Sequence, residues 1–302
     1  MKKKIGIIGT GLIGGSIALK LKHLELNDGI IIGHDYNTDH RHYSLSHQII
    51  DEYNEIDTLI KNSEVIFISI PVDEIVKILP IILDKVDNQM VIDIGSTKFP
   101  IVQSVKNHQK RGRYFATHPM WGREISGPSA AIKDSFSGKA VVLCDVIETD
   151  KDVVDYCKQL YTKFDMRLVF MNSDEHDKHV AYISHISHIT SFALANTVLN
   201  KETEEGNIFD LASAGFESTV RLAKSNKEMW TPIFIQNKEY ILDVLEEHIS
   251  QLEEFRRAIR KDDKEKLNNL ISKANRIKNI LPSDKKAIQN FSRFYELTRG
   301  LH

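Results

Sequence analysis

Cysteine is scarce in this sequence: Cys144 and Cys157 are the only two among 302 residues. Two cysteines exclude a disulfide-stapled scaffold and a cysteine-based metal cluster, and they favour a reducing compartment. No apolar run approaches the roughly 18 residues that a membrane-spanning helix needs. The N-terminus has basic residues, but glycines interrupt the apolar stretch behind them and there is no cleavage-like site. We therefore expect a soluble, cytoplasmic protein without a membrane partner.

An excess of either charge is also missing. Lys plus Arg total 40 and Asp plus Glu total 42, which leaves a formal net charge of −2. Nucleic-acid-binding proteins usually carry a basic excess, so we expect no nucleic-acid partner, although a local basic patch stays open. Apolar residues make up 41% of the chain, enough for a proper core. The length favours two domains.

The N-terminus carries a glycine pattern in a strand-turn-helix context. A short β-branched run at Lys4–Ile8 is typical of a buried strand, and a helical pattern follows Gly14. The residues between them form G-x-G-x-x-G, with glycines at positions 9, 11 and 14. In such a motif the first glycine permits a tight turn, the second admits a pyrophosphate and the third allows close helix packing. The pattern predicts a dinucleotide-binding turn.

An acidic residue ends the second predicted strand, at Asp35. A carboxylate there accepts hydrogen bonds from the adenosine ribose and repels a 2′-phosphate, so we expect NAD rather than NADP. A glycine-rich turn beside a solvated aspartate is the alternative. The candidate cofactor-binding residues are Gly9, Gly11, Leu12, Ile13, Gly14, Asp35, Ser69 and Pro71.

Strands and helices alternate up to residue 171. Further strands are expected at 64–70, 90–94, 139–145 and 166–171, with a helix over 72–86 that Pro80 interrupts and another around 153–160. Ligands bind at the carboxyl ends of such strands, where Pro71 and Ser96 lie. Ser96 could equally cap the helix after it. His118 ends an apolar run and precedes a proline, which suits a rigidly placed catalytic group or an ordinary strand end.

Helices alone are expected after Met171, at 173–200, 204–214, 216–225, 227–237, 238–261 and 264–281, with a tail helix after Pro282. We predict an α/β fold with a Rossmann-type dinucleotide-binding domain at 1–171. An all-helical substrate and dimerisation domain follows at 172–302. Long amphipathic helices often need a partner surface, so we expect a homodimer through the helical domain.

The predicted helix 173–200 mixes apolar and ionisable residues. Ser173 can cap it, and its isoleucines predict burial for most of its length. Asp177, Ser184 and His188 fall on one stripe of the helix, with His185 beside it. Hydrogen-bonded core histidines and a zinc site are alternatives, but the usual zinc-binding spacing is absent and we expect no metal. We prefer the interpretation that this polar stripe faces a cleft and binds an anionic or hydroxylated ligand.

Five motifs occur in order along the chain: GTGLIGGSIA, DIGSTK, THPMWGREISGP, HDKHVAYISHISH and GFESTVRLAKSNKEMW. Together they resemble the prephenate/arogenate dehydrogenase family of tyrosine biosynthesis, over roughly Lys4 to Asn237. The resemblance implies NAD-dependent oxidative decarboxylation of prephenate to 4-hydroxyphenylpyruvate. Hydride leaves C4, the 4-hydroxyl loses its proton, and the ring aromatises as CO2 departs.

The resemblance also assigns roles. His118 matches the base that accepts the 4-hydroxyl proton, and Ser96 matches a serine that contacts that hydroxyl and His118. Arg221 matches an arginine that binds a substrate carboxylate, with an ion pair to Glu217 as the structural alternative. The other implied substrate-side residues are His188, His185, Asp177 near the mouth of the cleft, and Trp230 near the site entrance, with core packing as the alternative for Trp230.

Other activities stay open. An aromatic residue stands at Trp121, where the family commonly has a small one, which weakens the preference for prephenate over arogenate as the substrate. A β-hydroxyacid-type NAD(P) dehydrogenase would use a lysine such as Lys178 or Lys224, but it leaves the His-Pro-Met motif unexplained. A protein that senses NAD without chemistry would have no reason to combine His118, Ser96 and Arg221.

Overall fold

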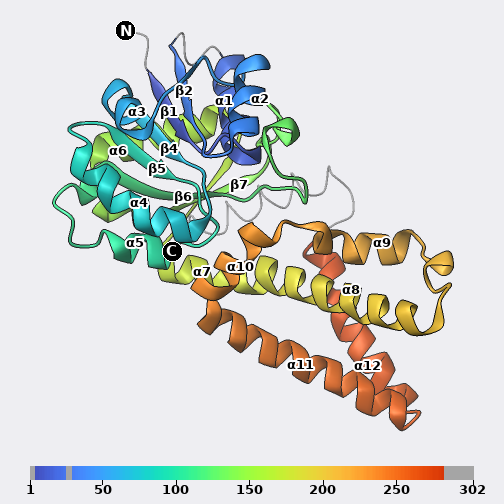
Figure 1. Ribbon diagram of the computed structural model, residues 1–302. Coiled ribbons are helices and arrows are strands. Elements are labelled where there is room, and N and C mark those ends of the chain that lie inside the picture. Colours follow the sequence, from blue (N-terminus) through green and yellow to red (C-terminus); the bar gives the residue numbers. More distant parts are fainter. Residues whose placement is uncertain (1–3, 25–28, 282–302) are drawn as a thin grey trace. The chain divides into compact units, whose positions relative to one another are not determined.

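The computed structural model describes residues 4–24 and 29–281 (Figure 1). The chain divides into two compact units, Met1–Leu242 and Asp243–His302. The first unit contains the sheet, its flanking helices and the helices up to the start of α11. The second contains the rest of α11 and α12. A functional division between residues 171 and 172 stays a prediction.

An eight-stranded sheet with the order β3-β2-β1-β4-β5-β6-β7-β8 organises the first unit. Neighbouring strands are parallel except β6 and β7, which are antiparallel. The central strands are mostly apolar, as is usual where helices cover both faces of a sheet, and Asp93 at the end of β5 is an exception. The strands are β1 (Ile5–Ile8), β2 (Ile31–His34), β3 (Glu52–Tyr53), β4 (Val65–Ile68), β5 (Met90–Asp93), β6 (Tyr114–Pro119), β7 (Ala140–Cys144) and β8 (Arg167–Met171).

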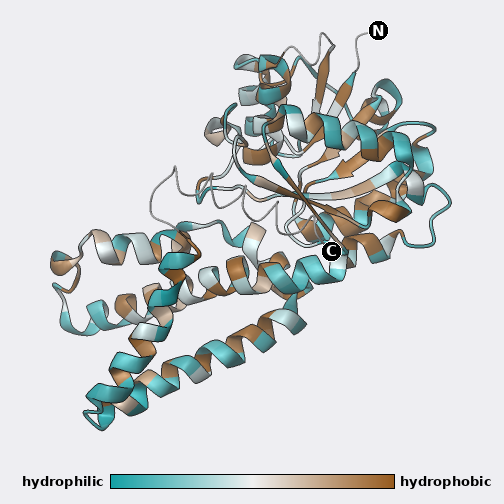
Figure 2. Ribbon diagram, turned by 180° about the vertical axis from the view of Figure 1, so that it is seen from behind, coloured by the Kyte–Doolittle hydropathy of each residue, from teal (hydrophilic) through white to brown (hydrophobic). Residues whose placement is uncertain are grey.

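Two apolar cores lie on the two faces of this sheet. One packs α1 (Leu12–His23) and α6 (Lys151–Lys163) against the strands. The other packs α3 (Ile56–Asn62), α4 (Val72–Lys85) and α5 (Phe99–Ser104), and it includes side chains of α10. Figure 2 shows the strands as the most hydrophobic elements. The predicted α/β class with a Rossmann-type domain is confirmed.

The expected interruption of the helix at Pro80 is wrong. Helix α4 runs through Pro80 without a break. Leu79 and Ile82 are fully buried on either side of the proline. The packing of this apolar face holds the helix together, although proline removes one intrahelical hydrogen bond.

The helices after β8 are α7 (Ser173–Val180), α8 (Ile186–Glu205), α9 (Ala214–Val220), α10 (Lys227–Gln236), α11 (Lys238–Arg260) and α12 (Lys264–Asn275). The helix predicted over 204–214 is wrong. Helix α8 ends at Glu205, its C-cap residue Gly206 has φ of 70°, and a short 3-10 turn at Phe209–Leu211 follows. Glycine adopts this left-handed conformation without strain, which is why it often terminates helices. The helix expected after Pro282 lies outside the described residues.

The segment predicted as one buried helix at 173–200 differs in three ways. Asn172, not Ser173, caps it, since its side chain accepts from the Glu175 N–H at 2.7 Å. A π-helical turn at Ala181–His185 separates α7 from α8. Burial is concentrated in α7 and this turn, whereas Ser191 is the buried residue of α8. A π turn shifts the angular phase of a helix, so spacing alone misjudges which side chains share a face. Within the described range, no helix has the length and apolarity needed to cross a membrane.

Candidate active site

The glycine-rich turn after β1 is closed toward the protein and open on one side. Gly9 has φ of 92°, and a Cβ there would lie 2.2 Å from the Ser69 carbonyl oxygen. A Cβ on Gly14 would lie 2.0 Å from the Gly9 carbonyl oxygen. A Cβ on Gly11 would meet no described atom within 4 Å. The turn therefore packs tightly through two glycines and leaves space at the third, as a bound pyrophosphate requires.

Asp35 follows β2 and is anchored rather than freely solvated. Its Oδ2 accepts from the Thr10 N–H at 2.9 Å, and its Oδ1 accepts from the Asn37 N–H at 2.9 Å. Its side chain is 12% exposed. Oδ2 also accepts from the Thr10 hydroxyl at 3.2 Å, so the second lone pair of Oδ1 is the one left for a ribose hydroxyl. The glycine-rich turn and the Asp35 carboxylate together suit the binding of a dinucleotide.

His118 lies near the carboxyl end of β6 and begins a buried chain of hydrogen bonds. Its Nδ1 is 2.8 Å from Nε2 of His176 in α7, and Nδ1 of His176 is 2.7 Å from Oδ1 of Asp177. The same carboxylate accepts from the backbone N–H groups of Lys98, at 2.7 Å, and Phe99, at 2.9 Å, where α5 begins. Asp177 is 1% exposed. Its expected place at the mouth of a cleft is wrong, because these three donors hold it in the interior.

Burial sets the protonation states along this chain. Desolvation, with the neighbouring His176 and Lys98, holds the pKa of His118 well below its usual value. Desolvation and Lys98 lower the pKa of His176 in the same way. Desolvation raises the pKa of Asp177 to about 6, although backbone N–H groups that bind it act in the opposite direction. At neutral pH both histidines are neutral and Asp177 is ionised.

A buried lysine lies near His118, and the sequence patterns gave it no role. Lys98 is fully buried, with its ammonium against the Asp93 carboxylate and 2.8 Å from the Thr117 carbonyl oxygen. Tyr114 donates to the other Asp93 oxygen at 2.6 Å. A signal was present in the sequence: Asp93 interrupts an apolar strand, and a buried charge requires a partner nearby.

Two further candidate histidines surround Trp230 of α10. His188 stacks on the indole with ring centroids 3.5 Å apart, and His185 meets it edge-on at 5.9 Å. The side-chain amide of Asn237 donates to Nδ1 of His185 at 3.0 Å and to the Asp177 carbonyl oxygen at 2.8 Å. Trp230 is 7% exposed and belongs to the core, but its Nε1 has no hydrogen-bond partner among the described residues.

Arg221 is half exposed and pairs with Glu124 rather than with Glu217. Its Nη1 lies 2.8 Å from Oε2 of Glu124, which belongs to the loop after β6. Glu217, the partner expected from helical spacing, lies 3.9 Å from Lys224 instead. Helix α9 ends at Val220, and Arg221 begins a 3-10 turn that breaks the i, i+4 geometry. The guanidinium thus stays within reach of solvent and of a ligand.

Two sequence profiles match consecutive parts of the chain. The profile "Prephenate dehydrogenase, nucleotide-binding domain" matches residues 17–170, and "Prephenate dehydrogenase, dimerization domain" matches residues 172–273. The prephenate dehydrogenase of Bacillus subtilis is 30% identical over 301 residues, which is 98% of this chain and 80% of that protein. The chain belongs to the prephenate dehydrogenase family.

Solved structures of this family agree with the fold. The prephenate dehydrogenase of Aquifex aeolicus, in complex with hydroxyphenyl propionate and NAD+, superposes with a TM-score of 0.84 at 27% identity, over 93% of this chain and 99% of that one. The arogenate dehydrogenase of Synechocystis has a TM-score of 0.71 at 24% identity, over 91% of this chain and 99% of that one. The second likeness concerns the fold alone.

Ser96 and Trp121, which belong to two of the sequence motifs, have simple surroundings. Ser96 is partly buried, and no hydrogen bond joins it to His118 in the described part of the chain. It does not cap α5 either, because Asp177 bonds the N–H groups there. Trp121 packs edge-on against Phe136 with ring centroids 5.7 Å apart, so core packing accounts for its aromatic side chain.

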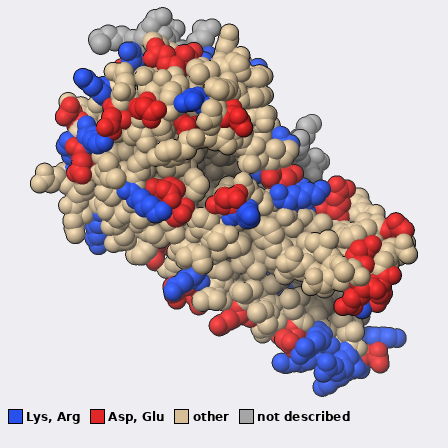
Figure 3. All heavy atoms as spheres, viewed as in Figure 1, with Lys and Arg blue, Asp and Glu red and all other residues tan. Residues whose placement is uncertain are grey.

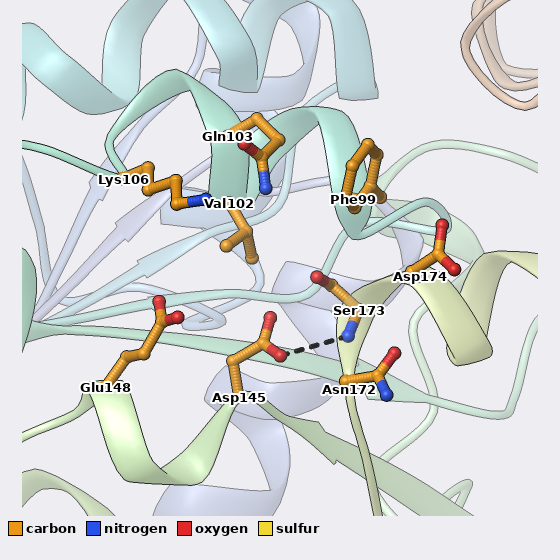
Figure 4. A pocket seen from close by; sticks show the side chains of 9 residues that line it. All are labelled: Phe99, Val102, Gln103, Lys106, Asp145, Glu148, Asn172, Ser173 and Asp174. Carbon is orange, nitrogen blue, oxygen red and sulfur yellow. Dashed lines mark hydrogen bonds between the residues drawn. The ribbon is translucent and has the colours of Figure 1, made fainter.

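A cavity of about 210 Å³ lies elsewhere, between α5, the turn Val146–Glu148 and the start of α7. Figure 4 shows Asp145, Glu148 and Lys106 around it, with Asp145 accepting from the Ser173 N–H. It contains none of the candidate site residues. Figure 3 shows acidic and basic side chains scattered over the visible face, with basic side chains gathered at its lower right end.

Proposed function

We propose that this protein catalyses the NAD-dependent oxidative decarboxylation of prephenate to 4-hydroxyphenylpyruvate in tyrosine biosynthesis. The observation that carries the proposal is a neutral, partly buried histidine on the same sheet edge as an open glycine-rich turn. Strands β1, β4, β5 and β6 are adjacent and parallel, so their carboxyl ends share one edge. Gly9, Ser69, Ser96 and His118 lie at those four ends. Ligands of open α/β sheets bind at this edge.

The reaction needs one base and binding groups for the two carboxylates of prephenate. His118 accepts the proton of the 4-hydroxyl while C4 gives up its hydride. The bound dinucleotide supplies the hydride acceptor. The resulting dienone withdraws the electrons of the bond to the ring carboxylate, which departs as CO2. His118 then returns its proton to the phenolate oxygen of the aromatic product. Protons and electrons balance without a metal ion.

Binding of the substrate falls to the polar residues around His118. We propose that Ser96 contacts the 4-hydroxyl and that the exposed guanidinium of Arg221 grips a carboxylate bidentately. His188 and His185 present imidazole groups from the same helical segment, with Trp230 stacked against the first. Asp177 serves from the interior, through His176. Together these residues would bind the two carboxylates and the 4-hydroxyl of prephenate.

NAD binding is proposed for the turn and its neighbours. Gly9, Gly11 and Gly14 shape the turn, and α1 begins at Leu12 and Ile13, whose backbone N–H groups would hold the phosphates. Ser69 and Pro71 border the same edge after β4. Asp35 accepts from the ribose, and its negative charge disfavours the 2′-phosphate of NADP.

The assembly is proposed as a homodimer through the helices after residue 171, with the nucleotide-binding domain at 1–171. The matches to a nucleotide-binding profile and a dimerization profile support this division. We also propose the cytoplasm as its compartment, since Cys144 and Cys157 are both buried and free.

An assay of NADH formation tests the function. Purified protein with NAD should turn over prephenate, and His118→Asn should lower kcat by ~10²–10⁴-fold while NAD still binds. Preferred turnover of arogenate would reassign the substrate. Absence of turnover with both acids, in protein that binds NAD, would refute the enzyme.

Arg221→Lys supplies a second arm of this assay. Lysine keeps the charge but cannot form the bidentate pair, so KM for prephenate should rise by a factor equivalent to ~2–3 kcal/mol. KM for NAD and the Tm should stay near wild type, because Arg221 is half exposed. An unchanged KM for prephenate would remove Arg221 from the substrate site.

A further inference from the structure

We propose that His176 and Asp177 position His118 by keeping its ring proton on Nδ1, so that Nε2 carries the lone pair that acts as base. The proposal rests on the proposed function for its chemistry and on three hydrogen bonds for its geometry. His176 is fully buried and Asp177 is 1% exposed, so neither can exchange these bonds for water. His176 is thus a positioning residue that acts through His118.

The direction of the hydrogen bonds between His118, His176 and Asp177 follows from the carboxylate at the Asp177 end. An ionised carboxylate only accepts, so Nδ1 of His176 donates to Asp177. A neutral imidazole has one donor and one acceptor nitrogen, which makes Nε2 of His176 the acceptor. Nδ1 of His118 must then donate across the 2.8 Å contact. His118 is left with Nε2 as its acceptor nitrogen, and this atom has no hydrogen bond among the described residues.

The carboxylate that sets this direction is itself immobilised. Its two oxygens accept from the N–H groups of Lys98 and Phe99, and the Asp177 backbone carbonyl accepts from Asn237. The start of α5 therefore holds the Asp177 side chain, and Asn237, the C-cap residue of α10, holds its backbone. The nearby Lys98 opposes a positive charge on His118, so the role of Asp177 is to orient the histidines through hydrogen bonds. The logic matches a carboxylate that orients a catalytic histidine in hydrolases, with a second histidine inserted between them.

The alternative is that His176 only fills space in the core. A phenylalanine would then replace it with little effect, because the ring volume is similar. A positioning role predicts instead a loss of kcat that depends on the base being present. Steady-state kinetics of His176→Phe separates the two. We expect kcat to fall ~10–100-fold, the range for residues that orient an active group, with KM for prephenate and NAD unchanged.

Matched variants make the experiment specific. His179→Phe introduces the same ring on the exposed face of α7 and should leave kcat unchanged. His176→Gln, which can both donate and accept, should retain more of kcat than His176→Phe. On a His118→Asn background, His176→Phe should cause no further loss. An equal loss on both backgrounds, or full activity of His176→Phe, would overturn the positioning role.

A measurement without substrate keeps the inference separate from the proposed function. Nitrogen-15 NMR of His118 in the whole protein should show a protonated Nδ1 and an unprotonated Nε2. In His176→Phe this preference should weaken. If no cyclohexadienyl acid is turned over but the NMR pattern is found, the function fails and the positioning stands. A protonated Nε2 in the wild type overturns the positioning whatever the activity, and His176→Gln serves for NMR if His176→Phe does not fold.

Discussion

The chemical usefulness of single residues here depends on what surrounds them. An imidazole in water titrates near pH 6.5, where half of it would be protonated and unable to act as a base. Burial of His118 beside His176 and Lys98 lowers its pKa, so the neutral form dominates at physiological pH. Arg221 differs, since half of its side-chain surface lies in solvent and its guanidinium pairs with Glu124.

The lowered pKa of His118 predicts the pH dependence of activity. Because protonation removes the base and the folded pKa lies well below 6.5, kcat/KM for prephenate should be flat around pH 7. It should fall in the acid range, first as Asp177, whose pKa is about 6, takes up a proton, and then as pH drops through the lowered pKa of His118. A kcat/KM profile measured from about pH 4 to pH 8 checks this, given the usual pKa of histidine. A midpoint at 6.5 or above would contradict the electrostatic role of burial.

At the scale of elements, the three glycines of the turn between β1 and α1 have different surroundings and therefore different roles. Gly14 is needed because the helix passes close to the Gly9 carbonyl, and Gly9 is needed for its positive φ and for contact with Ser69. Gly11 has an ordinary φ of −66° and no atom in the way. Its only evident reason for being glycine is the approach of a ligand.

Substitutions at Gly14 and Gly11 should therefore affect folding and cofactor binding separately. Gly14→Ala should lower the free energy of unfolding by ~1–3 kcal/mol, because the new methyl overlaps the Gly9 carbonyl oxygen. Gly11→Ala should leave Tm unchanged but raise Kd for NAD at least ~10-fold, about 1.4 kcal/mol. Thermal unfolding and NAD titration by calorimetry measure both. Tight NAD binding by Gly11→Ala would place the pyrophosphate elsewhere.

In the molecule as a whole, the helical region leaves apolar side chains in solvent. Within the second unit, Ile249, Leu252 and Ile259 of α11 are 50%, 56% and 62% exposed, and Ile271 of α12 is 50% exposed. Residues 249, 252 and 259 share one helix face by spacing. Contiguous apolar surface of this kind marks an interaction site in a folded protein. The dimerization profile that covers residues 172–273 suggests a second copy as the partner.

Charges placed on that face should separate the subunits. The double variant Ile249→Glu with Leu252→Glu is expected to sediment as a monomer, because it buries two carboxylates without partners in the interface. Ile147→Glu, at a residue that is 98% exposed in the nucleotide-binding region, serves as the control and should remain a dimer. Analytical ultracentrifugation distinguishes the two. A dimeric double variant would move the interface to another face.

Local patterns were sufficient for much of this protein. Continuous apolar runs predicted the longer strands, because strands covered on both faces must be apolar throughout. The spacing of Gly9, Gly11 and Gly14 between a strand and a helix predicted the turn, because its geometry depends on adjacent residues. The order of motifs predicted the family, which the sequence profiles confirm. Where a local rule failed, as at Pro80, packing outweighed propensity.

The arrangement of the candidate site depended on tertiary structure. His118 meets His176 across 58 residues, Asp177 meets Lys98 across 79 and Arg221 meets Glu124 across 97. A sequence pattern reports burial and backbone preference, but it does not report which polar groups face one another. Hydrogen bonds are directional and short, so a π turn in one helix or the start of another decides whether they form. For that reason the sequence could single out His118 as a candidate base, whereas its hydrogen-bond chain through His176 to Asp177 emerged only from the folded chain.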